Sequence, residues 1–266
     1  MPDSTHTTVP VAGGSVSLED LASALGARRP TTLMEMASDQ AAALGDASAE
    51  GDVAPDLPTH VLARLPSAQA DAQANADQIE RRRAAGGARQ LHQALAARVT
   101  ERHIGPKERL RRLRRLYDAW AKDVYPSSAC RTGCSHCCHI GVAVTRAEAE
   151  LISEETRIAL RAQQAQAPAS ALATVEDTLR AADELALRPR PCTFLSKQGR
   201  CTIYASRPLA CRQLHNLDVD DLLCRLIPGV AVPVPYADAT EMEILSITTM
   251  RDAHMADIRA WFGEAK

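Results

Sequence analysis

SSACRTGCSHCCHIGV occupies residues 127–142 and carries four cysteines within nine positions, Cys130, Cys134, Cys137 and Cys138. A two-residue gap lets both thiolates of a tight turn face one ion, and a three-residue gap brings a third around by about one helical turn. One loop can therefore supply three metal ligands. The sulfur of Cys138 points elsewhere, so it either serves a second metal or turns inward where the segment is helical.

A second stretch, PCTFLSKQGRCTIYASRPLACRQ at residues 191–213, contains three more cysteines, Cys192, Cys201 and Cys211. Such wide gaps suit ligands gathered by loops and a short hairpin, with Gly199 at its turn. Cys224 follows in DDLLCRLIPG, where it is either a further ligand or a buried core residue. Eight thiolates equal two tetrahedral sites of four, which both zinc and iron–sulfur clusters accept.

The composition favours an aliphatic, helical core and a metal explanation for the cysteines. Hydrophobic residues make up 45% of the 266 residues but aromatic residues only 3%, and no apolar stretch approaches the roughly 20 residues that span a bilayer. The sequence begins MPDSTHTTVPVAGG, without the basic and apolar regions of an export signal, so we expect a cytoplasmic protein. Cytosolic thiols stay reduced, which favours metal binding over a disulfide framework.

Charge and composition divide the chain into three predicted parts. Residues 1–66 are a flexible low-complexity leader, residues 67–124 an Arg-rich helical segment, and residues 125–266 a cysteine-cluster metal-binding domain that ends in a helix. The net charge is −9 over residues 1–80 and +10 over residues 81–122. The basic segment could contact nucleic acid, an acidic partner or the acidic leader. It lacks interleaved base-stacking aromatics, so nucleic acid is the less favoured partner and we expect a protein partner.

Helix signals occur in most of the chain. Two helices are predicted within residues 68–104, separated by Gly86-Gly87, and Leu110, Leu113, Leu116, Tyr117 and Trp120 form an apolar stripe on a third. Thr145 and Glu148 form a capping box that starts a helix through Leu151, Ile152 and Ile158. Further helices are predicted at residues 18–25, 32–44, 170–187 and 241–262, and strands only at residues 141–144 and 201–204. The predicted fold is mainly α, a helical domain with irregular cysteine-rich loops and at most a short β-hairpin around a metal centre.

Other side chains near the cysteines are candidate auxiliary groups. His136, His139 and His215 could act as nitrogen ligands or donate hydrogen bonds to sulfur. Arg207 and Arg212 bracket Cys211, where a cation would offset the negative charge of a thiolate-rich site. Ordinary surface pairing is the alternative for both arginines.

These motifs resemble the YkgJ family of cysteine-cluster proteins, the CxxCxxCC or zinc- or iron-chelating domain. The resemblance rests on Cys134-x2-Cys137-Cys138 with Cys130 upstream, and on the sequences PCTFL at 191–195, GRCTIY at 199–204 and RPLACR at 207–212. It covers residues 126–215, about a third of the chain. The resemblance implies a zinc or iron–sulfur centre held by Cys130, Cys134, Cys137, Cys138, Cys192, Cys201 and Cys211.

Four functions are compatible with these features. The first is a metal-binding module whose closed centre stabilises a helical scaffold for a partner. The second follows from a similar domain in flagellin lysine methylase, which implies an iron–sulfur, S-adenosylmethionine-dependent methyltransferase using His139, His215 or Asp218–Asp221. A redox or metal-delivery protein is the third. The fourth, a radical S-adenosylmethionine enzyme, shares the Cys130-x3-Cys134-x2-Cys137 spacing but requires repeated strand–helix units that this sequence lacks. The sequence alone assigns no reaction.

Overall fold

The computed structural model describes residues 8–11, 14–17, 57–161, 190–225, 232–249 and 255–263. Within these ranges the fold is mainly α, as predicted. The helices are α3 (Leu57–Ala85), α4 (Ala88–Val99), α5 (Pro106–Val124), α6 (Arg146–Thr156), α9 (Leu209–Arg212), α10 (Thr240–Thr249) and α11 (Ile258–Phe262). Short 3-10 helices are η1 (Tyr125–Ser127), η2 (His136–Cys138), η3 (Tyr204–Ser206) and η4 (Leu222–Cys224). The strands form two antiparallel pairs, β1 (Thr8–Val11) with β2 (Gly14–Ser17) and β3 (Ala143–Thr145) with β4 (Met255–Asp257).

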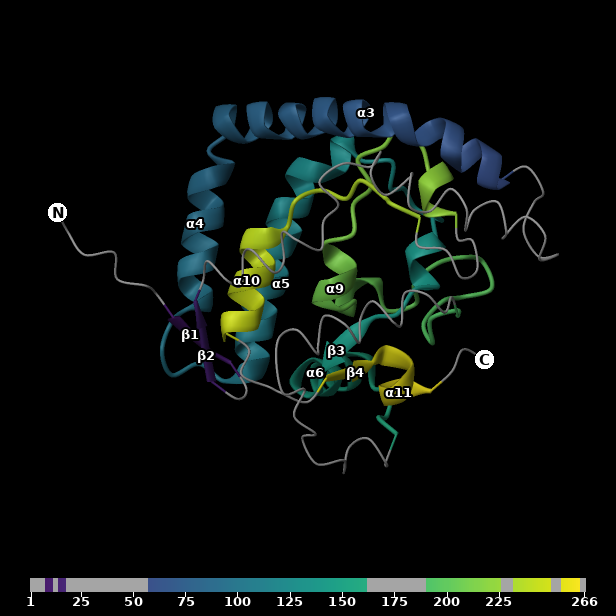
Figure 1. Ribbon diagram of the computed structural model, residues 1–266. Helices are drawn as coiled ribbons and strands as arrows, with labels where there is room; N and C mark the ends of the chain where they lie inside the picture. Colours follow the sequence, from purple (N-terminus) through teal and green to yellow (C-terminus); the bar gives the residue numbers. More distant parts are fainter. Residues whose placement is uncertain are drawn as a thin grey trace.

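Helix α3 spans the top of the molecule in Figure 1 and begins at Leu57, earlier than the sequence predicts. It runs through Pro66, which cannot donate the helical backbone hydrogen bond. Val61, Leu65 and Ala68 flank this proline and are fully buried. Their packing explains why the helix continues through a residue that usually ends one.

The predicted joint between two helices at Gly86-Gly87 is confirmed. Helix α3 ends just before it and α4 begins just after it. Gly87 has φ of +68°, a left-handed conformation that favours glycine. The chain turns here, so that α4 descends from one end of α3 and packs beside α5 (Figure 1).

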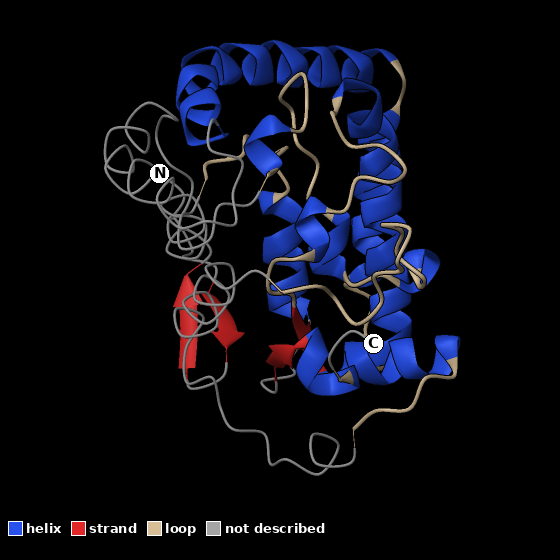
Figure 2. Cartoon of the chain, turned by 90° about the vertical axis from the view of Figure 1, so that its right-hand side faces the viewer, coloured by secondary structure: helices blue, strands red, loops and turns tan. Residues whose placement is uncertain are grey.

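The apolar stripe predicted on α5 is also confirmed. Its five members are all at most 4% exposed: Leu110, Leu113, Leu116, Tyr117 and Trp120. They form one hydrophobic core with residues of α3, α4, α6, α9 and α10. Figure 2 shows that loops run beneath the long helix at the top of the view and between the other helices. Helix α5 therefore lies at the centre of the first hydrophobic core and packs against α9, which carries Cys211.

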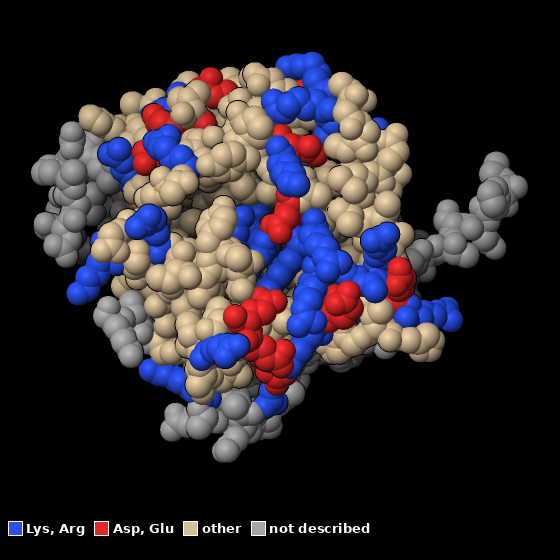
Figure 3. Space-filling model, turned by 180° about the vertical axis from the view of Figure 1, so that it is seen from behind, with Lys and Arg blue, Asp and Glu red and all other residues tan. Residues whose placement is uncertain are grey.

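The arginines of α5 are largely paired with acidic side chains. Arg114 is buried and bonds to Glu155 of α6 at 2.6 Å, and Arg112 bonds to Glu101 at 2.5 Å and Glu108 at 3.0 Å. Basic and acidic side chains are interleaved on the face seen in Figure 3. The high positive charge of the sequence segment is thus partly neutralised by neighbouring acids on the folded surface.

A second hydrophobic core lies under the cysteine loops, where β3, β4, α6 and α11 meet. Trp261 of α11 is fully buried in it and donates from Nε1 to the Val144 carbonyl at 3.0 Å. Cys192, Cys201 and Cys211 pack against the edge of this core. The C-terminal segment therefore supports the cysteine loops directly.

Two helix predictions and one strand prediction need correction. The Thr145 cap is confirmed, since its Oγ1 accepts from Glu148 N at 3.2 Å, but α6 ends at Thr156 and leaves Ile158 exposed. The predicted single helix at 241–262 is wrong, because residues 255–257 form a strand that pairs with β3, between the helices α10 and α11. The predicted strand at 201–204 is reduced to one bridge between Leu195 and Cys201. The predicted helix at 170–187 lies outside the described residues.

A β-hairpin lies within the predicted leader, where the sequence analysis expected no strands. Strands β1 and β2 pair in antiparallel register, with Thr8 opposite Ser17 and Val11 opposite Gly14. The helices predicted at 18–25 and 32–44 lie outside the described residues. No helix in the described part of the chain has the length and apolar character required to cross a membrane.

Candidate metal centre

Backbone hydrogen bonds join the two cysteine-bearing segments. The Cys192 amide donates to the Cys138 carbonyl at 2.7 Å, and the Arg190 amide donates to the His139 carbonyl at 2.7 Å. The turn at Gly199, with φ of +70°, lies against the first loop, and a side chain at Gly199 would meet the Gly133 carbonyl oxygen at 3.6 Å. Loops far apart in sequence are therefore in direct contact.

Three sulfurs form what we call the Asn216 neighbourhood: Cys130, Cys134 and Cys224. The Asn216 backbone amide donates to Cys130 Sγ at 3.4 Å, and its side-chain Nδ2 donates to Cys224 Sγ at 3.4 Å. Burial raises the pKa of Cys224, and the charges of Cys130 and Cys134 raise it further. These thiols thus lie close enough to oppose each other's ionisation.

Three others form the core neighbourhood, which packs on the second hydrophobic core: Cys192, Cys201 and Cys211. Burial is the main cause that raises the pKa of each of these thiols. Mutual charge adds to it, since Cys192 and Cys201 both act on Cys211. This neighbourhood therefore also groups sulfurs from three separate points in the chain.

The pair Cys137-Cys138 lies between the two neighbourhoods, in the 3-10 helix η2. Its contact with Cys138 is the largest cause that raises the pKa of Cys137, followed by burial. The charge of Cys137 acts on Cys224 in one neighbourhood and on Cys201 and Cys211 in the other. Cys137 therefore lies near sulfurs of both groups, and Cys138 lies next to it.

Cys224 is not a buried core residue. The neighbouring Leu223 is 1% exposed, whereas Cys224 is only partly buried at the end of η4. All eight cysteines of the chain are free thiols. Across the described ranges no group of three or more Cys, His, Asp or Glu side chains is already arranged to hold an ion. The structure therefore groups the sulfurs without setting them at coordination distances.

The donor chemistry of these groups fits a thiophilic metal. Each neighbourhood offers partly buried thiols whose ionisation is opposed by burial and by the other sulfurs. A cation such as Zn²⁺ or an iron–sulfur core removes that opposition, because it binds the thiolate form. The fit concerns the kind and grouping of the ligands, and it does not distinguish the two metals.

Arg207 and Arg212 have different roles. Burial raises the pKa of the Cys201 and Cys211 thiols, and the cation of Arg207 opposes that rise in both. Arg207 also stacks on the Tyr204 ring at 4.3 Å. Arg212 is 3% exposed and ties α9 to its surroundings, donating to the Arg207 carbonyl at 3.0 Å and to the Asp118 carboxylate of α5. Arg207 is thus the counter-charge, and Arg212 is a buried structural residue.

Two of the candidate histidines, His136 and His139, have polar partners other than sulfur, whereas both ring nitrogens of His215 are buried without a hydrogen-bond partner in the described part of the chain. His136 Nε2 lies 3.3 Å from the Asp221 carboxylate, and His139 Nδ1 lies 3.1 Å from the Ser135 carbonyl. His215 is 4% exposed and packs edge-on against Trp120, with ring centroids 5.4 Å apart. Burial lowers the pKa of His215 to about 4, so its ring is neutral near pH 7.

The acidic residues after Asn216 are also engaged in the local structure. Asp218 forms an ion pair with Arg64 of α3, and the Asp220 carbonyl accepts from Asn216 Nδ2 at 2.8 Å. Burial raises the pKa of Asp221, but His136 and the nearby arginines outweigh it and lower the pKa. The carboxylates of Asp218, Asp220 and Asp221 are therefore all bonded to other groups of the protein, namely Arg64, the Leu222 amide and His136.

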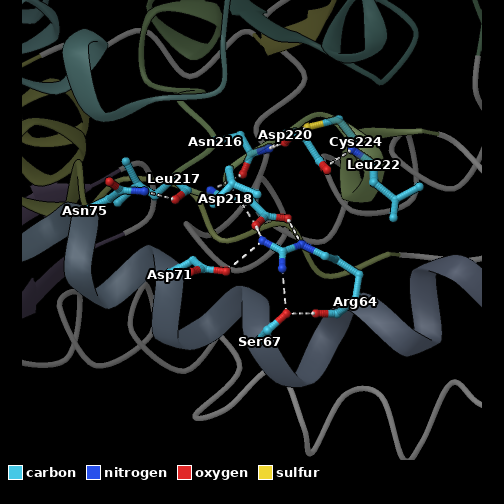
Figure 4. Close-up of polar contacts among 11 residues, drawn as sticks. Arg64, Ser67, Asp71, Asn75, Asn216, Leu217, Asp218, Asp220, Leu222 and Cys224 are labelled. Atoms are coloured by element: carbon cyan, nitrogen blue, oxygen red, sulfur yellow. Dashed lines mark hydrogen bonds and ion pairs between the residues drawn. The ribbon is translucent and has the colours of Figure 1, made fainter.

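Sequence reasoning missed the residues that hold the Asn216 neighbourhood together. Arg64, Asp218 and Asn216 form a continuous polar chain from α3 to the sulfurs (Figure 4). The only local signal is the turn in which Asn216 Oδ1 accepts from Asp218 N at 2.8 Å. The contact with α3 spans 154 positions and has no local signature.

The part of the chain that carries the cysteines matches a known protein family. Residues 129–225 match the CxxCxxCC family. This family is described as a "putative zinc- or iron-chelating domain". The match confirms the resemblance read from the cysteine motifs and indicates metal binding. No curated protein and no solved structure matches the chain.

The CxxCxxCC domain contains all eight cysteines as well as α6 and α9. Helices α3, α4 and α5 precede it, and α10 and α11 follow it. Arg64 and Trp261, which brace the cysteine loops, both lie outside the matched residues. The domain is therefore supported by structure on both sides of it.

Proposed function

We propose that this is a metal-binding protein of the YkgJ type whose centre, zinc or an iron–sulfur cluster, fastens the cysteine loops to the helical scaffold. The proposed ligands are Cys130, Cys134, Cys137, Cys138, Cys192, Cys201, Cys211 and Cys224. The observation that carries the proposal is the contact between the two cysteine-bearing segments, joined by two backbone hydrogen bonds of 2.7 Å. The scaffold presents a surface to a protein partner in the cytoplasm.

The grouping of the sulfurs supports two adjacent centres. The Asn216 neighbourhood and the core neighbourhood each hold three cysteines, and the Cys137-Cys138 pair lies between them. One sulfur of the pair added to each neighbourhood gives two sets of four thiolates. Four sulfurs match the coordination of both structural zinc and iron–sulfur clusters.

The electrostatics support the same proposal. Both neighbourhoods contain thiols that oppose one another's ionisation. In the core neighbourhood, Arg207 favours the ionisation of Cys201 and Cys211, and Arg259 favours that of Cys192. Metal binding converts thiols to thiolates and releases protons, so the affinity should increase as the pH rises. The metal would thus supply binding energy to loops that have little regular structure of their own.

The proposed centre is closed and structural, because sites ligated only by thiolates are typically closed. Two cavities of about 460 and 870 Å³ lie among the described residues, one lined by α3, α4, α5 and α10 and the other by the segment around His103 and the end of α10. Neither is lined by a cysteine. The iron–sulfur methyltransferase alternative requires a substrate cavity at the centre, and titration of S-adenosylmethionine by anaerobic calorimetry tests it.

Anaerobic purification followed by metal and sulfide analysis and an optical spectrum tests the proposal. Zinc without sulfide identifies closed zinc centres, and iron with equivalent sulfide identifies a cluster. The Cys201→Ser variant should lose the metal of the core neighbourhood, whereas Thr202→Ser, which changes the adjacent residue and keeps its hydroxyl, should retain all of the bound metal. Full-length protein without stoichiometric metal under these conditions would contradict the proposal.

A further inference from the structure

Asn216 contacts sulfurs of two cysteines that lie far apart in sequence. Its backbone N–H donates to Cys130 Sγ and its side-chain Nδ2 to Cys224 Sγ, both at 3.4 Å. Asn216 itself is 1% exposed. A buried amide that faces sulfur is suited to hold a thiolate, because a hydrogen bond to an ionised acceptor is stronger than one to a neutral acceptor.

The orientation of the Asn216 amide is fixed by its other bonds. Oδ1 accepts from the Asp218 amide at 2.8 Å, which leaves Nδ2 facing the Asp220 carbonyl and Cys224. Its main chain is held as well, since its carbonyl accepts from the Ala129 amide at 2.9 Å. The donor is therefore positioned before any ligand arrives.

Helix α3 holds the turn that contains Asn216. The Asp218 side chain is 0% exposed and pairs with Arg64, whose Nε lies 3.3 Å from Oδ2. Arg64 is itself paired with Asp71 at 2.8 Å, and Asn75 Nδ2 donates to the Leu217 carbonyl at 2.8 Å (Figure 4). Helix α3 therefore holds the turn at residues 216–218 through bonds that do not involve the sulfurs.

We propose that Asn216 is a positioning residue of the metal centre, which holds Cys224 through its side-chain amide and Cys130 through its backbone amide. This inference rests on the proposed function. Donation from Nδ2 to the Cys224 sulfur withdraws negative charge from the bound thiolate and fixes its direction. Partners that orient metal ligands in this way change metal affinity by about 10–100-fold when they are mutated.

The test uses the full chain loaded anaerobically with Co²⁺, which reports thiolate ligation by its charge-transfer absorption. Asn216→Asp keeps an oxygen for the Asp218 amide and loses the donor to Cys224. Asn216→Ser keeps a short acceptor for the same turn and adds no charge. Asn75→Ala is the matched control, because it removes a hydrogen bond from α3 to the same loop and touches no sulfur.

Both Asn216 variants should bind Co²⁺ about 10–100-fold more weakly, with a shifted charge-transfer band, whereas Asn75→Ala should keep the affinity and the band. Unchanged affinity and band in both Asn216 variants would overturn the inference. Loss of helical circular dichroism in both, with Asn75→Ala folded, would also overturn it, because Asn216 would then be a folding residue. A wild-type protein with neither a thiolate-to-cobalt band nor, after anaerobic reconstitution with iron and sulfide, the absorption of a cluster would instead refute the proposed function.

Discussion

The ion pair between Arg64 and Asp218 gives a quantitative prediction for the attachment of α3. The Asp218 side chain is 0% exposed and that of Arg64 is 17% exposed. Replacing Arg64 by methionine keeps most of its apolar stem but leaves the Asp218 charge buried without its cation. Breaking a buried pair in this way costs about 3–5 kcal/mol. Because Arg64 retains some contact with solvent, we expect the lower end, about 3 kcal/mol, for Arg64→Met.

Two comparisons separate the loss of the pair from a general loss of packing. Asp71 also pairs with Arg64, but its side chain is 38% exposed, so Asp71→Ala should cost at most about 1 kcal/mol. The double variant Arg64→Met, Asp218→Asn removes the unpaired charge. It also keeps an oxygen for the Val219 amide, which donates to Asp218 Oδ1 at 2.8 Å in the wild-type structure. It should recover most of the stability lost in the single variant.

Denaturant unfolding at pH 7, followed by far-ultraviolet circular dichroism, measures these differences. The reasoning would be refuted by an Arg64→Met variant no less stable than Asp71→Ala. It would equally be refuted by a double variant no more stable than Arg64→Met, since the buried charge would then not be the source of the loss.

Three further predictions concern the residues around the cysteine loops. Burial raises the pKa of Glu148 above its ordinary 4.5, so the stability that its neutral form contributes is lost as the pH rises through the folded pKa. Glu148→Gln keeps an acceptor for the Leu209 amide and should therefore be more stable than wild type at pH 7. The difference in stability between the two proteins should disappear near pH 4. A less stable variant at pH 7 in thermal unfolding would contradict this. Gly199→Ala should lose about 1 kcal/mol in denaturant unfolding because φ is +70°, and an unchanged midpoint would count against the strain argument. Trp261→Phe should lose about 1–3 kcal/mol because the Val144 carbonyl loses its buried donor, and a melting temperature equal to that of wild type would show that this bond is unimportant.

The sequence was sufficient to predict the elements that depend on residues close together in the chain. The α5 stripe repeats at helical spacing, and all five of its apolar residues are buried. The Thr145 cap and the glycines at 86–87 mark helix boundaries through short-range chemistry, and the structure places the boundaries there. Gly199 likewise marks the turn it was expected to form.

Elements that depend on distant partners could not be predicted in the same way. Residues 255–257 have a helical pattern in sequence, but they pair with β3, more than a hundred positions earlier. Glu148 was expected to reach back to its own cap, yet its carboxylate accepts from the Leu209 amide at 2.8 Å. In both cases a tertiary contact replaced the local one.

The candidate site shows the same division. The cysteines were identified from their spacing, and the contact between their two segments agrees with a joint site. The chain of Arg64, Asp218 and Asn216 was not identified, because polar residues of common type become informative only when a fold brings them to a sulfur. Arg207 and Arg212 were both candidate counter-charges from their position beside Cys211; Arg207 opposes the rise in the pKa of Cys211, whereas Arg212 is buried and bonds to Asp118, which its sequence position does not indicate.

In the proposed function, cysteines from both cysteine-bearing segments bind metal together. Alkylation of the metal-loaded protein, before and after chelation, with each cysteine quantified by mass spectrometry, tests it most directly. We predict that Cys201 and the Cys137-Cys138 pair are protected when metal is bound and become reactive when it is removed, and that in Cys201→Ser one cysteine of the Cys137-Cys138 pair loses its protection as well. Protection of that pair that Cys201→Ser leaves unchanged, or reactivity that metal does not change, would contradict joint binding.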